Sequence, residues 1–236
     1  MGKRGPKPKR KEVVWSSALA YAIGLIASDG CLSNDGRHLF FVSKDLEQIE
    51  NFKKCLGLKV KTGIHRAGKR MKNRIYHRVQ WGDVVLYSFL LNIGLMPAKS
   101  KVLGALIVPD KYFFDFLRGS FDGDGSFYSY FDPRWKSSFM YYLSFNSASL
   151  PHVDWLRKTL QRLLGVTGHI SKTGGGGGER HLIASLRFAK REALVVMGAM
   201  YPTLCKVHLS RKRLKIERAL RIVGKSLPTV RKNLTK

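Results

Sequence analysis

Acidic residues are scarce in this sequence of 236 residues. Lys and Arg together number 43 against 16 Asp and Glu, which gives a formal net charge of +27 at pH 7. A folded domain with that much self-repulsion usually has a polyanion as its partner. We therefore expect the chain to bind nucleic acid. A ribosomal or chaperone-bound basic protein and a binder of membrane surfaces are the alternatives.

Long apolar runs and paired cysteines are also missing. No segment approaches the roughly 20 apolar residues of a membrane helix, and the basic residues 1–11 lack the apolar stretch of a signal peptide. The cysteines Cys31, Cys55 and Cys205 are far apart and odd in number, so they form neither a disulfide nor a metal-ligand pattern. We expect free thiols in a reducing, intracellular compartment (prokaryotic cytoplasm or the inside of an organelle) and no membrane partner.

Apolar residues make up 44% of the chain, which is enough for a substantial core. Their spacing predicts the order helix, hairpin, helix, hairpin, helix twice. The first set is predicted at 15–28, 31–44, 45–57, 59–81 and 83–94, and the second at 111–123, 126–146, 150–165, 166–190 and 191–201. One more helix is predicted at 210–224. A five-element order that occurs twice indicates a degenerate duplication.

The duplication predicts an α+β fold of two pseudo-symmetric αββαββα units with antiparallel sheets. The expected divisions are a basic arm (1–14), a first unit (15–98), a linker (99–110), a second unit (111–224) and a basic tail (225–236).

The first helix of each unit ends in a similar stretch, AIGLIASDG at 22–30 and LRGSFDGDG at 117–125. Aligning them places Gly24 over Gly119 and Asp29 over Asp124. Small residues along one helix face allow two backbones to approach closely. If these helices pack side by side and parallel, both aspartates emerge at the same end.

Two adjacent carboxylates at helix C-termini are unfavourable, because they repel each other and face the negative ends of two helix dipoles. A divalent cation removes both objections, and metal-bound carboxylates serve phosphodiester hydrolysis. The alternatives for DGDGS at 122–126 are a plain tight turn or a calcium-binding EF-hand loop. The EF-hand interpretation fails because the twelfth residue from Asp122 is Pro133 and not Glu.

On these two motifs the sequence resembles the LAGLIDADG homing endonucleases, in their single-chain form with two motifs. The resemblance covers roughly residues 15–224. It implies that the motif helices form the centre and that two four-stranded sheets make a saddle over double-stranded DNA. It also implies a monomeric, Mg²⁺-dependent, site-specific endonuclease that leaves staggered ends at a long, loosely palindromic target. Ca²⁺ or Mn²⁺ can substitute for Mg²⁺ in binding.

The resemblance also implies roles for individual residues. Asp29 and Asp124 are the expected catalytic metal ligands, with the backbone carbonyls of Ser28 and Gly123 beside Gly30 and Gly125. A basic residue is expected near each acid, and Lys99 and Lys212 lie at matching places in the repeat. A lysine there can polarise a water or counter charge on the phosphate. Simple solvated lysines are the alternative.

A further polar residue is expected where the second strand of each unit ends. Lys44 fits in the first unit, and Ser149 or Asn146 in the second. The family pattern often has another acid two positions before the catalytic one. Asp122 supplies it in the second motif, whereas Ala27 stands there in the first.

Half-buried strands should alternate apolar and polar side chains, which leaves one face for DNA. A two-stranded ribbon fits the major groove, and basic residues at hairpin tips bind phosphates. For example, Ile75, Val79 and Trp81 are expected to face the core. The expected DNA-binding residues are Arg37, Ser43, Lys69, Arg70, Lys72, Arg74, Tyr76, Arg78, Gln80, Arg134, Lys136, Tyr142, Ser144, Asn146, Lys172, Arg180, Ser185 and Arg187.

Two other functions fit the same scaffold. One is an RNA-intron maturase, for which intron RNA is a further partner, and the other is a DNA-binding regulator that no longer cleaves. The presence of both Asp29 and Asp124 argues against lost cleavage and leaves an added role with RNA open.

Overall fold

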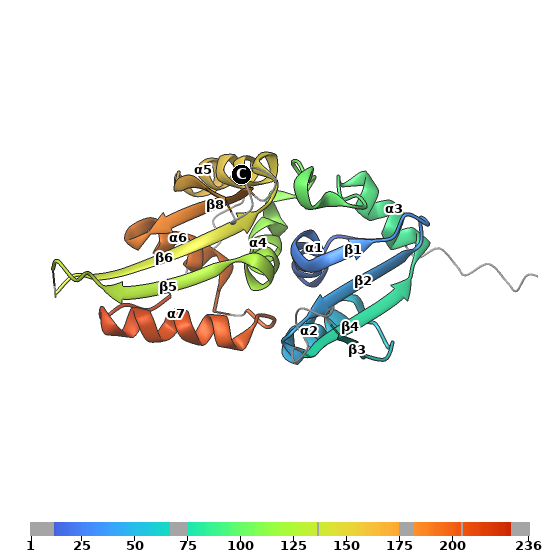
Figure 1. Cartoon of the computed structure of the whole chain (residues 1–236), viewed down its shortest axis with the longest axis horizontal. Helices are drawn as coiled ribbons and strands as arrows, with labels where there is room; N and C mark the ends of the chain where they lie inside the picture. Colours follow the sequence, from blue (N-terminus) through green and yellow to red (C-terminus); the bar gives the residue numbers. More distant parts are fainter. Residues whose placement is uncertain (1–11, 67–74, 136, 175–181, 204, 228–236) are drawn as a thin grey trace, which may run out of the picture.

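Two helices occupy the centre of the computed structural model, which describes residues 12–66, 75–135, 137–174, 182–203 and 205–227. Helix α1 (Ser17–Asp29) and helix α4 (Asp110–Asp124) lie side by side (Figure 1). Ser16 begins α1 as an N-cap, since its hydroxyl accepts a hydrogen bond from Leu19 N at 3.1 Å. Residues 19–27 of α1 are all buried, because α4 covers one face and other elements of the first unit pack against the rest.

The first unit follows α1 with β1 (Gly30–Leu32), β2 (His38–Ser43), α2 (Leu46–Leu56), β3 (Gly63–Arg66), β4 (Ile75–Gly82) and α3 (Val84–Asn92). Its strands form an antiparallel sheet in the order β1-β2-β4-β3. A short 3₁₀ turn at Lys99–Lys101 then leads toward α4.

The second unit repeats this order with β5 (Ser126–Phe131), β6 (Phe139–Ser147), α5 (Leu150–Leu164), β7 (His169–Gly174), β8 (Leu182–Ala189) and α6 (Lys190–Met200). Its sheet has the matching antiparallel order β5-β6-β8-β7. A further helix, α7 (Ser210–Ile222), runs beside β5 (Figure 1). The predicted α+β fold with two pseudo-symmetric units is therefore confirmed.

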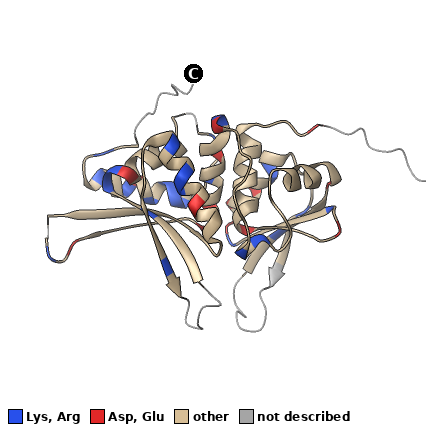
Figure 2. Cartoon of the chain, turned by 90° about the horizontal axis from the view of Figure 1, so that it is seen from above, with Lys and Arg blue, Asp and Glu red and all other residues tan. Residues whose placement is uncertain are grey.

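The two sheets lie on the same side of the helices. Seen from above, the helices lie on one side and the strands of both units on the other, while the β5–β6 hairpin extends sideways (Figure 2). This arrangement has the outline of the expected saddle, with α1 and α4 at its middle.

Local sequence signals explain where several elements end. Gly57 and Gly165 stop α2 and α5 in the left-handed conformation, with φ of 63° and 68°. Asp45 occupies the N-cap position of α2 but makes no side-chain capping bond; its carboxylate pairs with Arg211 instead.

The alternation expected for β6 is largely present. Phe139, Tyr141, Leu143 and Phe145 are buried, while Tyr142 and Asn146 reach the opposite face. On β4 the prediction for Ile75 was wrong, since this side chain is 63% exposed whereas Val79 and Trp81 are buried. Ile75 is paired only with Arg66 at the outer end of the sheet, beyond the cover of α2.

All three cysteines carry free thiols. Within the described residues, no helix combines the length and the apolar character that crossing a bilayer requires.

Candidate active site

Backbone contact between α1 and α4 explains the glycines of the two motifs. A Cβ atom added at Gly24 would lie 2.1 Å from Phe116 O, and one added at Gly119 would lie 2.1 Å from Tyr21 O. A Cβ at Gly123 would meet Ser28 Oγ at 2.0 Å. Real side chains do not approach so closely, so only glycine permits this distance between the helices.

This packing brings Asp29 and Asp124 together, each as the last residue of its helix. Both side chains reach the surface, but protein surrounds them on their other sides. Desolvation and the neighbouring Asp124 raise the pKa of Asp29 to about 7, against the opposing effect of Lys212 and Lys99. Desolvation also raises the pKa of Asp124. A cation shared by the two carboxyls would stabilise their charged forms, which are otherwise disfavoured here.

Lys99 reaches this end of the helices from the 3₁₀ turn after the first unit. The side chain is buried, with 6% exposed, and Nζ donates a hydrogen bond to Gly30 O at 2.5 Å. Desolvation lowers the pKa of Lys99. Ala98, directly before it, has φ of 51°, a left-handed conformation that is uncommon for a residue with a side chain.

Lys212 approaches the second motif from the first turn of α7. Its Nζ donates to three backbone carbonyls at the end of α4, those of Phe121 (2.6 Å), Gly123 (2.9 Å) and Gly125 (2.7 Å). A cation in this position complements the negative end of the helix dipole. Desolvation lowers the pKa of Lys212 to about 8.

The two acids alone do not complete a metal shell. Among the described residues, no three His, Cys, Asp or Glu side chains lie close enough to hold an ion together. Mg²⁺ is nevertheless commonly held by one or two carboxylates together with water and substrate phosphates. The paired acids, whose repulsion a cation would remove, fit such an open site. Of the predicted carbonyl ligands, Gly123 O already accepts from Lys212 but keeps a second lone pair.

The residue that accompanies Asp124 on the second sheet is Asn146. Its Nδ2 donates to Asp124 O at 2.9 Å, and its Oδ1 accepts from Ser185 Oγ at 2.7 Å. Ser149, the other candidate, is fully buried and donates to Leu103 O, so it is not at this site. Lys44 is exposed just beyond β2, with Nζ 5.5 Å from the centre of the Tyr76 ring.

A buried polar network behind the second motif was not predicted from the sequence. Asp122 Oδ2 accepts from Tyr21 Oη and from Leu209 N, both at 2.8 Å. Arg118 donates to Met200 O (2.7 Å) and Val207 O (2.8 Å) and is paired with Asp115. The available signal was an arginine in an apolar motif helix, at the place that Ile23 takes in α1.

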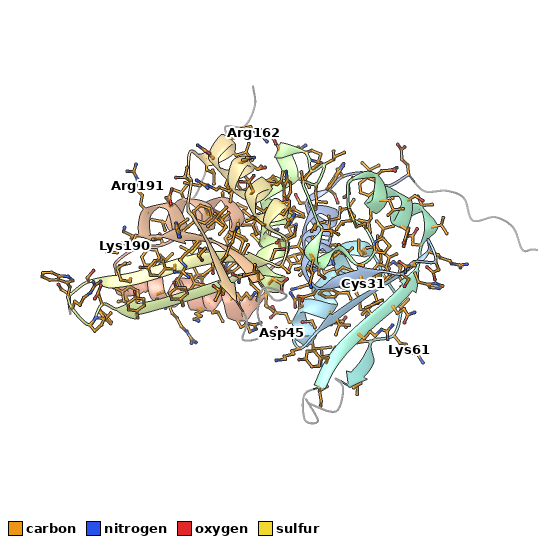
Figure 3. The ribbon with its side chains drawn as sticks, turned by 45° about the horizontal axis from the view of Figure 1, so that its top comes forward. Cys31, Asp45, Lys61, Arg162, Lys190 and Arg191 are labelled. Atoms are coloured by element: carbon orange, nitrogen blue, oxygen red, sulfur yellow. The ribbon has the colours of Figure 1, made fainter. Side chains whose placement is uncertain are left out.

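Acids of the first unit also hold the start of α7. Glu47 accepts from Ser210 N at 3.1 Å and from its hydroxyl, and Arg211 donates to Asp45 at 2.8 Å. Asp45 lies at the boundary between the two units (Figure 3). The position of Lys212 therefore depends on residues of both units.

Solved structures share the fold of this chain. A LAGLIDADG meganuclease, I-AabMI, bound to uncleaved DNA, is 14% identical over 86% of this chain and 91% of that chain, with a TM-score of 0.54. The chain has the LAGLIDADG fold. I-DmoI in complex with DNA and Ca is 15% identical over 86% of this chain and 97% of that one, with a TM-score of 0.52.

Full-length WhiA from Thermatoga maritima also has this fold. It is 17% identical over 92% of this chain, with a TM-score of 0.55, and the chain spans 64% of its length. No sequence-family model matches the chain, and the comparison with curated proteins finds no similar sequence. At these identities the likeness establishes the LAGLIDADG fold, while the activity must be argued from the site.

The face of the first sheet that would meet DNA in a LAGLIDADG saddle is polar. Arg78 lies with its guanidinium carbon 4.9 Å from the centre of the Phe40 ring and donates to Gln80 Oε1 at 2.6 Å. Tyr76 belongs to the same face of β4. Ser43 does not, and this prediction was wrong. Its side chain is buried, and its hydroxyl donates to Gln48, because it lies where β2 turns into α2.

The corresponding face of the second sheet is aromatic. Tyr142 stacks on Tyr128 with ring centres 4.9 Å apart, and the Arg187 guanidinium lies 5.9 Å from the Tyr142 ring. Ser144, expected to contact DNA, is only 4% exposed and is hydrogen-bonded to Ser126 Oγ at 2.7 Å. The register explains this correction, since Ser144 lies between its strand neighbours Ser126 and Arg187.

The remaining predicted DNA contacts lie in hairpins. Arg37 and Lys172 are exposed, and Arg134 is also exposed but is paired with Asp132 at 3.0 Å. Six others lie outside the described residues: Lys69, Arg70, Lys72, Arg74, Lys136 and Arg180.

Proposed function

We propose that this protein is a site-specific DNA endonuclease that uses a divalent metal, with Mg²⁺ as the physiological ion. The observation that carries the proposal is the pair Asp29 and Asp124 at the common end of α1 and α4, with the buried Lys99 beside the first motif and the half-buried Lys212 beside the second. Folding alone does not require acids and lysines at the common end of α1 and α4, since two carboxylates there destabilise each other.

In this proposal Asp29 and Asp124 hold the metal, which supplies charge stabilisation for the phosphodiester being cut. Asn146 fixes the backbone at Asp124, and the glycine contacts fix the separation of the two acids. The basic and aromatic sheet faces bind the DNA on either side. Because the outward residues of the two sheets differ, the target is long and only loosely palindromic. Because both sites reside in one chain, the protein acts as a monomer. It leaves staggered ends.

The test is a cleavage-site selection on a randomised duplex library in Mg²⁺. The wild type is compared with the double variant Asp29→Asn/Asp124→Asn, which keeps the size of both side chains. We expect staggered cuts in one long motif with the wild type and none with the variant. Binding without cutting in both Mg²⁺ and Mn²⁺ would overturn the proposal.

A cleavage-inactive DNA-binding protein is the second candidate, because WhiA, which is not named as an endonuclease, has the same fold as this chain. In that case the wild type and the double variant would select the same duplex motif without cutting it.

A further inference from the structure

Lys99, which is buried, and Lys212, which is half-buried, make different hydrogen bonds although they occupy matching places in the repeat. Lys212 donates to three carbonyls, which accounts for all three N–H groups of an ammonium. Lys99 donates to Gly30 O, the one acceptor within hydrogen-bond range of its Nζ among the described residues. Lys99 thus keeps two N–H groups for another acceptor, whereas Lys212 keeps none.

The surroundings of the two lysines also differ, since the segment that carries Lys212 is held by more hydrogen bonds. Lys212 follows Leu209, whose N–H donates to Asp122, and Ser210, which is held by Glu47 from the other unit. This network fixes the start of α7 against the end of α4. Lys99 instead lies in a three-residue 3₁₀ turn entered through the left-handed Ala98, and Ala27 occupies the place of Asp122.

We propose that Lys99 donates directly to the DNA phosphate, whereas Lys212 is a positioning residue that holds the end of α4, and with it Asp124, through the network centred on Asp122. This inference rests on the proposed nuclease function and deepens it. Its consequence is that the two sites are unequal. The strand served by Lys99 is cut first, by about tenfold in rate, which corresponds to roughly 1.4 kcal/mol in the barrier.

The first experiment measures the cutting of each strand separately. A duplex carrying the selected target receives a different label on each strand and is cut under single-turnover conditions in Mg²⁺. We expect Lys99→Met to slow the faster strand by at least about tenfold and to leave the slower strand nearly unchanged. Lys212→Met should slow only the slower strand, and a higher Mg²⁺ concentration should partly restore it, because Asp124 is then less well placed to bind the ion.

Asp122 provides the matched pair of variants for the positioning role. Asp122→Ala removes the acceptor for Leu209 N and should slow the slower strand alone, whereas Asp122→Asn keeps an oxygen there and should restore the rate. A purely structural loss would slow both strands equally. A readout without metal is the melting temperature in a chelator. Lys212→Met should lower it more than Lys99→Met, since three carbonyls lose their donor instead of one.

Equal rates on the two strands of the wild-type target, or equal effects of Lys99→Met and Lys212→Met on both strands, would overturn this inference and leave the nuclease function standing. Failure to cut either strand would instead overturn the nuclease function itself.

Discussion

The two units of this chain share a backbone plan but differ in what stands behind their motif helices. In α1 the positions facing the interior are apolar, with Ile23 and Ala27. At the matching places in α4 stand Arg118 and Asp122, both buried and both hydrogen-bonded. Gly24 and Gly119, and the terminal Asp29 and Asp124, stand at matching places in the two helices. The common residues therefore set the helix crossing and the pair of acids, while the differing residues determine how each lysine is held.

The largest expected effect comes from breaking the part that the units share. Gly24→Val and Gly119→Val each place a side chain against the backbone of the other helix, where neither backbone can yield. We expect each to lower the free energy of unfolding by about 3 kcal/mol or more, or to prevent folding. Chemical denaturation measures this. Gly104→Val is the control, because a Cβ at Gly104 meets nothing within 4 Å. Stability equal to the control would contradict the close packing.

The next largest effect is a loss of stability that differs between the two units. Arg118→Leu leaves the Asp115 carboxylate and the Met200 and Val207 carbonyls without their donor, and should cost about 3 kcal/mol. Ile23→Leu, at the matching place in α1, should cost less than about 1.5 kcal/mol. Urea denaturation compares them directly. Similar losses for both variants would mean that the polar network contributes no more than the apolar packing of the first unit.

The outward faces of the two sheets are expected to contact different halves of the DNA target. Arg78→Ala should weaken binding by about 1–3 kcal/mol and relax base preference in one half of the target. Arg187→Ala, from the aromatic face, should act on the other half. Binding to target libraries randomised in one half at a time measures both. If both variants changed the same half, the assignment of one sheet to each half of the target would be wrong.

The smallest expected effect concerns pH. Because the pKa of Asp29 is raised to about 7, the folded protein binds a proton that the unfolded chain has released. Without metal, stability therefore falls as pH rises from about 4 to about 7. We expect the melting temperature in a chelator to fall less steeply over this range for Asp29→Asn, a difference of a few degrees. Added Mg²⁺ should stabilise the wild type more at pH 8 than at pH 5. Parallel curves for the two proteins would contradict the raised pKa.

Much of this arrangement could be predicted from the sequence because it rests on local or periodic signals. Helical spacing, turn glycines and the in-register motifs sufficed for the two units and for bringing Asp29 and Asp124 to one end. The errors arose where a tertiary contact decides. Ser144 has the outward parity of β6 but is covered by its strand neighbours, and Ser43 lies on the core-facing side of β2, where its hydroxyl donates to Gln48. Strand alternation cannot reveal such contacts.

The network around Asp122 could not have been predicted in the same way. Its partners Tyr21 and Leu209 are 101 and 87 positions away, and no sequence pattern joins them. In the sequence Asp122 is an extra acid of the motif, and nothing distinguishes Arg118 from the other Lys and Arg residues, which number 43 in all. Their burial, which gives them their role, follows from the packing of α4 against α6 and the segment before α7.

The proposed nuclease function requires that Asp29 and Asp124 together bind a metal ion that supports hydrolysis of the DNA. The most direct measurement is anomalous diffraction from crystals of the protein with its selected target and Mn²⁺. We expect an anomalous peak within ligand distance of both carboxylates in the wild type. The peak should be lost in the double variant Asp29→Asn/Asp124→Asn. DNA bound on the sheets with no metal between the two acids would contradict it.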